Sequence, residues 1–168
     1  MCRTQLILVY GLPGSGKSYF SKALSELTQI ARYNSDEIRT DTGLKGNYSE
    51  EAKSQVYERL LELAKKQLEQ GKSVIIDANF SLPRQRQVFK HLAYELQAGF
   101  YAIILEADES ISLNRLNQER PYSEANARVY YTLKNAALYN DEETLHLQST
   151  NENLEEMLLR TMSYLQYE

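Results

Sequence analysis

The sequence predicts an α/β fold in which helices cover both faces of a mainly parallel sheet. Short, continuous apolar runs alternate along the chain with longer segments whose apolar residues recur at helical spacing. Continuous rather than alternating apolar runs are typical of strands that are buried on both faces. Strands that alternate with helices form three-layer domains with a parallel sheet, so we expect that architecture here.

The expected strands follow in chain order. They span residues 6–10, 30–34, 74–77, 100–105 and 145–148. A glycine follows the first run and an aspartate closes the third, whereas the second and the last runs carry fewer apolar residues. The helices are therefore expected in the segments between these runs.

The first helix should follow a glycine-rich turn, because apolar residues recur there at positions i, i+3, i+4 and i+7. These residues are Phe20, Ala23, Leu24 and Leu27. Residues 40–48 contain two glycines and no periodicity, which predicts a mobile loop. Ser49 is expected to cap a long helix that Gly71 ends. The buried stripe of that helix would consist of Val56, Leu60, Leu63, Ala64 and Leu68.

Four helices are expected in the second half of the chain. Ser81 would cap a helix that reaches about residue 97. Two polar helices should follow over residues 108–118 and 123–139, and together they resemble a lid. The last helix is amphipathic and would bury Leu154, Met157, Leu158, Thr161 and Leu165.

Length and composition indicate one compact domain over residues 1–168, with 42% apolar and 25% charged residues. The net charge of −4 disfavours a dedicated nucleic-acid binder, although a small basic groove on an acidic body stays possible. The single cysteine, Cys2, allows no internal disulfide and fits a reducing cytosol. Because no apolar run approaches the roughly 20 residues of a membrane span, we expect a cytoplasmic protein without membrane contact.

Residues 11–18, GLPGSGKS, match the pattern G-x-x-x-x-G-K-[ST] at every fixed position. Glycines let the backbone turn its N–H groups around phosphate oxygens, and the following helix points its positive end at the same anion. The expected nucleotide-binding residues of the loop are Gly11, Gly14, Ser15, Gly16, Lys17 and Ser18. Lys17 would reach the β- and γ-phosphates, and the Ser18 hydroxyl would bind Mg²⁺. The loop predicts binding of a nucleoside triphosphate, ATP with Mg²⁺.

A phosphate-binding loop of this kind usually works with an acidic residue at the end of another strand, which holds Mg²⁺ or its waters. Asp77 closes the third apolar run and fits that position. The alternative interpretation of Asp77 is a helix or turn cap. Asp36 competes with it for the metal.

Asp36 and Arg39 form a second candidate pair just beyond a strand-like segment, where ligands bind in open α/β sheets. At spacing i, i+3 on a helical turn they would share a face. The carboxylate could accept a hydroxyl proton while the arginine grips a nearby anionic group. The alternative is a helix cap with a solvated surface ion pair.

Arginines of a mobile element commonly stabilise the charge that develops during phosphoryl transfer. Arg115 and Arg120 lie in the polar region after the fourth strand, and Arg128 lies in the next polar helix. Each could instead be a solvated surface residue.

These features, in this order along the chain, resemble the small P-loop kinases of the AAA_33 type. The resemblance rests on the phosphate loop, on the Asn34-x-Asp36-x-x-Arg39 stretch, on residues 74–79 (VIIDAN) and on the Arg115/Arg120 region. That group includes the kinase domain of phage-type polynucleotide 5′-kinase; zeta toxins and chloramphenicol phosphotransferases are similar at a greater distance. The resemblance covers nearly the whole chain.

The resemblance implies the P-loop nucleoside triphosphate hydrolase/kinase fold, with a five-stranded, mainly parallel sheet and a helical lid. It implies that Asp36 activates the acceptor hydroxyl and that Arg39 binds a phosphate of the acceptor. Asp77 and Asn79 would lie near the acceptor and the metal. Arg115 would serve catalysis and nucleotide binding from the lid, and Arg120 would join it in catalysis.

The sequence departs from that group in two places. The spacing between Arg115 and Arg120 is one residue longer than in the polynucleotide kinases. An insertion after Asn79 leaves Arg84 and Arg86 as rivals for one acceptor-binding role.

The leading hypothesis is an ATP-dependent kinase that acts on a hydroxyl of a small molecule or of a nucleic-acid 5′ end. The alternative is a nucleotide-binding NTPase or regulatory protein without a dedicated acceptor. A GTPase should carry Asn-Lys-x-Asp to read guanine, and that motif does not occur here. The sequence does not predict the oligomeric state.

Overall fold

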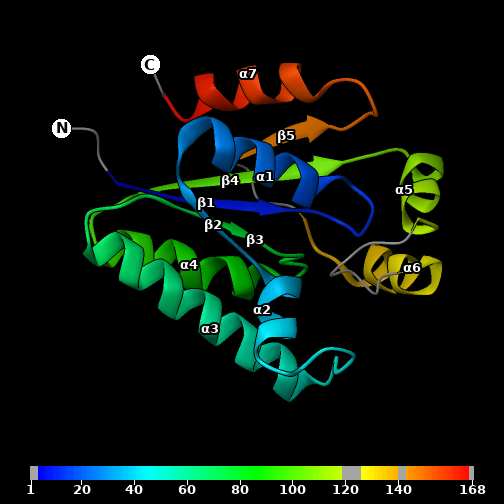
Figure 1. Ribbon diagram of the computed structural model, residues 1–168, viewed down its shortest axis with the longest axis horizontal. Coiled ribbons are helices and arrows are strands. Elements are labelled where there is room, and N and C mark those ends of the chain that lie inside the picture. The colour runs from blue at the N-terminus through cyan, green and yellow to red at the C-terminus, as the bar shows by residue number, and fades with distance from the viewer. Residues whose placement is uncertain (1–3, 119–125, 140–142, 167–168) are drawn as a thin grey trace.

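The computed structural model describes residues 4–118, 126–139 and 143–166, and a parallel sheet lies at its centre (Figure 1). The strands are β1 (Gln5–Tyr10), β2 (Ala31–Asn34), β3 (Val74–Asp77), β4 (Gly99–Glu106) and β5 (Thr144–Gln148). Their order across the sheet is β2-β3-β1-β4-β5, and every neighbouring pair is parallel. The predicted α/β fold with a five-stranded parallel sheet is thereby confirmed.

Helices pack on both faces of the sheet, which gives the three predicted layers. They are α1 (Lys17–Thr28), α2 (Ser35–Asp41), α3 (Glu50–Glu69), α4 (Pro83–Glu95), α5 (Glu109–Leu116), α6 (Ala127–Ala136) and α7 (Leu154–Tyr164). Figure 1 shows α1 and α7 on one face, with α3 and α4 on the other. Among the described helices, none combines the length and apolar character needed to span a membrane.

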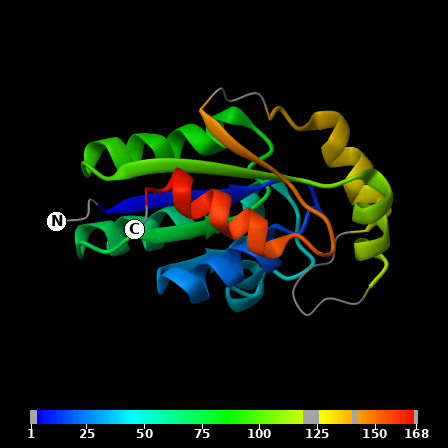
Figure 2. The same cartoon turned by 90° about the horizontal axis from the view of Figure 1, so that it is seen from above.

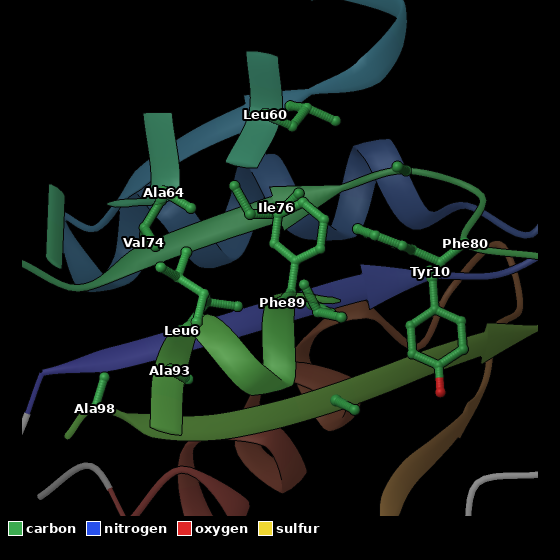
Figure 3. Packing of buried hydrophobic residues seen from close by; sticks show 14 of the residues in the cluster. Leu6, Tyr10, Leu60, Ala64, Val74, Ile76, Phe80, Phe89, Ala93 and Ala98 are labelled. Carbon is green, nitrogen blue, oxygen red and sulfur yellow. The ribbon is translucent and has the colours of Figure 1, made fainter. Parts of the chain in front are cut away.

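The two faces of the sheet bury two separate apolar clusters, because successive side chains of a strand point to opposite faces. Leu6, Leu8 and Tyr10 of β1 enter the cluster under α3 and α4, whereas Ile7 and Val9 enter the cluster under α1 and α7. Figure 3 shows the first cluster, where Leu60 and Ala64 of α3 and Phe89 and Ala93 of α4 surround Leu6 and Ile76 of the sheet. Strands buried in this way explain the continuous apolar runs.

The carboxyl ends of the strands define the ligand side of the molecule. In Figures 1 and 2 the strands run toward α5 and α6, which lie beyond that edge of the sheet. Register places Asn34 of β2 beside Asp77 of β3, and both residues are the last of their strands. The predicted lid segment contributes α5 and α6 to the same edge, while its residues 119–125 lie outside the described residues.

The helix predicted from Phe20, Ala23, Leu24 and Leu27 is confirmed as α1. Phe20 and Leu24 are fully buried, whereas Leu27 is 55% exposed, because helical spacing defines a face without saying how much of it other elements cover. Two local predictions were wrong. Ser81 does not cap α4; the N-cap is Leu82 and the helix begins at Pro83, a residue favoured at the first helical position. Residues 40 and 41 of the predicted loop belong to α2.

Ser49 caps α3 as predicted, and its hydroxyl accepts a hydrogen bond from Ala52 N at 3.2 Å. Gly71, which follows this helix with a φ of +71°, adopts the left-handed conformation that commonly ends helices. The long helix therefore lies where its sequence signals predict it.

We predict that Leu24→Ala lowers the free energy of unfolding by about 2–5 kcal/mol, since it opens a cavity in the cluster under α1. Leu27→Ala, on the same helix, should change it by less than about 1 kcal/mol, because that side chain is largely in water. Urea denaturation of both variants measures the difference. Equal destabilisation by the two substitutions would contradict the position of α1.

Candidate active site

The phosphate loop connects β1 to α1 through a turn that only glycine can make. Gly11 and Gly14 have φ angles of +146° and +78°. A Cβ atom on Gly11 would lie 2.3 Å from the carbonyl oxygen of Leu105, and one on Gly14 would lie 2.5 Å from that of Ser112. Backbone of β4 and α5 therefore closes around the turn, and any side chain at these positions would displace it.

Lys17 and Ser18 form the first turn of α1 and line a large cleft at the ligand edge of the sheet. The cleft has a volume of about 1700 Å³ and extends from the phosphate loop to α3, α4 and α6. The N-terminus of α1 carries a partial positive charge at this place, because the first N–H groups of a helix have no partner within the helix. The arrangement suits a phosphate chain that lies against Lys17.

Asp77 is the central charged group beside the phosphate loop, and its side chain has no exposed surface. Its Oδ2 atom accepts hydrogen bonds from Ser21 Oγ at 2.7 Å, Arg32 Nη2 at 2.7 Å and Asn34 Nδ2 at 2.9 Å. Its Oδ1 atom is buried and has no partner among the described residues. A carboxylate with one saturated and one unused oxygen can still take a ligand.

Arg32 was not predicted as a site residue, although it lies two positions before Asn34 in a strand and therefore on the same face. Burial alone would lower the pKa of Arg32, but the charges of Asp77 and Glu37 and their hydrogen bonds outweigh burial and raise it. The ion pair with Asp77, at 2.7 Å, is thus a fixed part of the site.

Asp36 and Arg39 both lie on α2 and both line the cleft. Arg39 is 7% exposed; its Nη1 donates to the carbonyl of Asn47 at 2.9 Å, and its guanidinium lies 4.6 Å from the ring centre of Tyr48. Its Nε atom is buried without a partner among the described residues. The guanidinium is therefore enclosed, which disagrees with a solvated surface ion pair.

Arg84 and Arg86, the two rivals on α4, lie in different surroundings. Arg84 lines the cleft together with Asn79. Arg86 is 3% exposed and donates to the carbonyls of Phe80 and Leu138, so it stands in the core and does not line the cleft. Residues two apart on a helix do not share a face, so the expectation of acceptor contact fits Arg84 and not Arg86.

Phe80 connects this core to the ligand edge and has a φ of +45°, an unusual value for a bulky residue. Tyr57 accepts a hydrogen bond from Phe80 N at 3.1 Å, and burial raises the pKa of Tyr57 to about 12. Tyr139 donates to the carbonyl of the preceding residue, Asn79, at 2.7 Å. Together with Arg86, these side chains hold the backbone that presents Asn79 to the cleft.

Arg115 lies against the phosphate loop and against the segment after β5. It donates to the carbonyl of Gly14 at 3.1 Å, to Ser149 Oγ at 3.2 Å and to the carbonyl of Thr150 at 2.9 Å. Arg120 lies outside the described residues, and Arg128 lines the cleft from α6. These partners hold the Arg115 guanidinium in one place between the phosphate loop and the segment after β5.

Comparison with known proteins gives both a family and a fold. The AAA_33 family model, described as an AAA domain, matches residues 6–137. No curated protein matches the chain.

Solved kinases share the fold at low sequence identity. An unliganded sugar kinase from Janibacter sp. HTCC2649 is 15% identical, with a TM-score of 0.74 over 97% of this chain and 95% of that one. An APS kinase from Mycobacterium tuberculosis, in complex with AMPPNP and APS, is 14% identical with a TM-score of 0.75 over 99% of both chains. A gluconokinase from Sinorhizobium meliloti 1021 is 15% identical, with a TM-score of 0.72 over 99% of this chain and 94% of that one. The fold is that of P-loop kinases.

We predict that Arg86→Met destabilises the protein by about 1–3 kcal/mol for each carbonyl that loses its donor. Arg84→Met should stay within about 0.5 kcal/mol of the wild type, because its side chain lines an open cleft. Thermal unfolding of the two variants, which carry the same substitution two residues apart, makes the comparison. If Arg84→Met is the more damaging change, the two arginines have been assigned the wrong way round.

Proposed function

We propose that this chain, which belongs to the AAA_33 family of AAA domains, is an ATP-dependent kinase that transfers the γ-phosphate of Mg-ATP to an acceptor hydroxyl. The main support is that one cleft is lined by the phosphate-loop residues Lys17 and Ser18 and by the carboxylate–guanidinium pair Asp36 and Arg39. A protein that only binds nucleotide needs the first pair and not the second. The acceptor is a small molecule or the 5′ end of a nucleic acid.

The nucleotide half of the cleft would hold ATP by its phosphates. Backbone N–H groups of the loop and the N-terminus of α1 would surround the phosphate oxygens, and Lys17 would balance their charge. Arg115 and the residues after β5 would form the wall next to the base. Since the chain lacks Asn-Lys-x-Asp, adenine is the expected base.

The residues of the metal side fit Mg²⁺. Ser18 is an exposed residue that lines the cleft, and Asp77 offers the buried Oδ1, which has no partner among the described residues. Mg²⁺ in such sites usually takes few protein ligands and keeps substrate phosphates and waters as the rest. When bound, the ion neutralises the charge of the phosphates, while Ser18 and Asp77 orient it or its waters.

The part of the cleft lined by Asp36, Arg39 and Arg84 would bind the acceptor and accept its proton. Asp36 would accept the proton of the acceptor hydroxyl as its oxygen forms a bond to the γ-phosphorus, and the bond to the bridging oxygen of ADP breaks. Arg39 would hold an anionic group of the acceptor.

Arg84 faces the opposite wall of the cleft. The hydrogen bond and charge of Lys53 lower the pKa of Glu50 on α3, and the nearby charge of Arg84 contributes to the same shift.

An ADP-release screen against hydroxyl acceptors tests the proposal, and the panel should contain small polyols, nucleosides, and 5′-hydroxyl RNA and DNA. We predict that at least one acceptor stimulates ADP release and that Lys17→Ala abolishes the stimulation while the fold survives. Calorimetric titration with Mg-ATP should show the same loss of binding in this variant. ADP release that no acceptor stimulates would favour a nucleotide-binding NTPase or regulator instead.

We predict that Asp36→Asn lowers the rate of transfer by about 10²–10⁴-fold, the usual contribution of a positioned general base, with ATP affinity nearly unchanged. Arg39→Ala should instead raise the KM for the acceptor, most for acceptors with a phosphate near the reacting hydroxyl. Steady-state kinetics with phosphorylated and neutral acceptors separates the two effects. Transfer by Asp36→Asn at the wild-type rate would show that this carboxylate is not the base.

A further inference from the structure

Asn34 lies between Asp36, the proposed base, and the proposed metal-side residues Asp77 and Ser18. It is the last residue of β2, it is 4% exposed, and register places it directly beside Asp77 of β3. Side chains of paired residues in parallel strands point to the same face, which here is the face that carries α1. Asn34 therefore lies among Asp77, α1 and the start of α2.

The amide oxygen of Asn34 caps α2. Its Oδ1 accepts hydrogen bonds from Asp36 N at 2.9 Å and from Glu37 N at 3.0 Å. These are two of the N–H groups that a helix leaves unpaired at its first turn. The position of the Asp36 backbone thus depends on the orientation of this one side chain.

The amide nitrogen of Asn34 points away from α2, toward Asp77 and Ser18. Its Nδ2 donates to Asp77 Oδ2 at 2.9 Å and, more weakly, to Ser18 Oγ at 3.4 Å. An amide that faces two N–H donors on one side and a carboxylate on the other has only one satisfactory orientation. Aspartate or serine could also cap α2, but neither can cap it and donate across this distance to Asp77.

We propose that Asn34 is a positioning residue that couples the Asp36 side of the reaction to the metal-side groups Asp77 and Ser18. The proposal rests on the proposed phosphoryl transfer, because that reaction needs the hydroxyl oxygen and the γ-phosphate aligned to within a fraction of an ångström. One buried amide fixes the base-bearing helix and the metal carboxylate relative to each other. A cap without this link would hold α2 but would leave Oδ2 of Asp77 to the Ser21 and Arg32 donors, with no amide joining it to Asp36 N.

Arg32 adds a second connection between the same two elements. Its Nη2 donates to Asp77, and its Nη1 pairs with Glu37 of α2 at 3.0 Å. The first turn of α2 is therefore joined to Asp77 twice, once through an amide and once through a guanidinium. Arg32 thus reaches α2 through the side chain of Glu37, whereas Asn34 accepts from the backbone N–H of Asp36 itself and donates to Asp77.

The substitution Asn34→Ser separates the two contacts, since serine is among the best N-caps but is too short to reach Asp77. Asn34→Ala removes both contacts. We expect Asn34→Ser to weaken Mn²⁺ binding by the ADP complex about tenfold and to lower kcat by a similar factor, as loss of an outer partner of a metal ligand does. The KM for the acceptor should stay within about twofold of the wild-type value. Electron paramagnetic resonance titration of free Mn²⁺ gives the first quantity without any turnover.

Two controls make the result specific. Hydrogen exchange of the Asp36 and Glu37 amides should stay slow in Asn34→Ser and become fast in Asn34→Ala, which reports whether the cap survives. Ser25→Ala removes a hydrogen bond to the carbonyl of Ile30 before β2 and should lower stability without changing Mn²⁺ affinity. Wild-type Mn²⁺ affinity and kcat in Asn34→Ser would overturn the proposal and leave Asn34 as a cap alone. If the wild type phosphorylates no acceptor, the proposed function fails, whereas lost Mn²⁺ affinity in Asn34→Ser would still support the coupling.

Discussion

A buried negative charge determines how the ligand side of this molecule is built. The Asp77 side chain has no exposed surface, and a carboxylate removed from water costs several kcal/mol unless a counter-charge and hydrogen-bond donors surround it. Arg32 supplies the counter-charge, and Ser21 and Asn34 supply further donors. These partners come from β2 and α1, so satisfying one charge fixes both elements against β3. These three donors bind the same oxygen, and among the described residues Oδ1 has no partner, which leaves it for a ligand.

The phosphate loop depends on a steric constraint of a different kind. Gly11 and Gly14 lie so close to backbone oxygens of Leu105 and Ser112 that no side chain fits, so β4 and α5 determine the shape of the turn. Arg115 adds hydrogen bonds from α5 to the loop and to the segment after β5. The loop is therefore shaped by contacts that are distant in sequence. The pattern of its residues predicts what it binds, whereas its conformation is maintained by the rest of the sheet.

The fold could be predicted from sequence because its signals are local and repeated. The central strands β1, β3 and β4 are recognisable as continuous apolar runs, and the edge strands β2 and β5 follow from the alternation of strands with helices, so all five strands were placed within a residue or two. How much of a helix is buried depends on neighbouring elements: Leu27 continues the periodicity of α1 but is 55% exposed. The start of α4 was predicted wrongly at Ser81, because Pro83 takes the first helical position. Periodicity predicts which face of a helix is buried, and the packing of other elements decides how much of it.

In the candidate site, too, some residues could be identified from the sequence and others depend on tertiary packing. The phosphate loop is contiguous in sequence, so its residues were identifiable together. The sequence could not distinguish the roles of Arg84 and Arg86, because these depend on tertiary packing. Arg84 lines the cleft, whereas Arg86 donates to two carbonyls in the core. Arg32 was missed because an arginine inside a strand has no motif. Its spacing from Asn34 was the available signal, since i and i+2 in a strand share a face.

The overall charge of the chain is a weaker guide to its acceptor than the local charge of the cleft. The net charge of −4 is spread over a surface in water, where exposed charges are screened within about 8 Å at physiological ionic strength. Arg39 is 7% exposed, and at such depth its field is screened much less. Recognition of one anionic group next to a reacting hydroxyl requires a few enclosed donors and not a basic surface. The net charge therefore does not argue against the proposed recognition of one phosphate group, although it disfavours binding of a long duplex through its backbone charges.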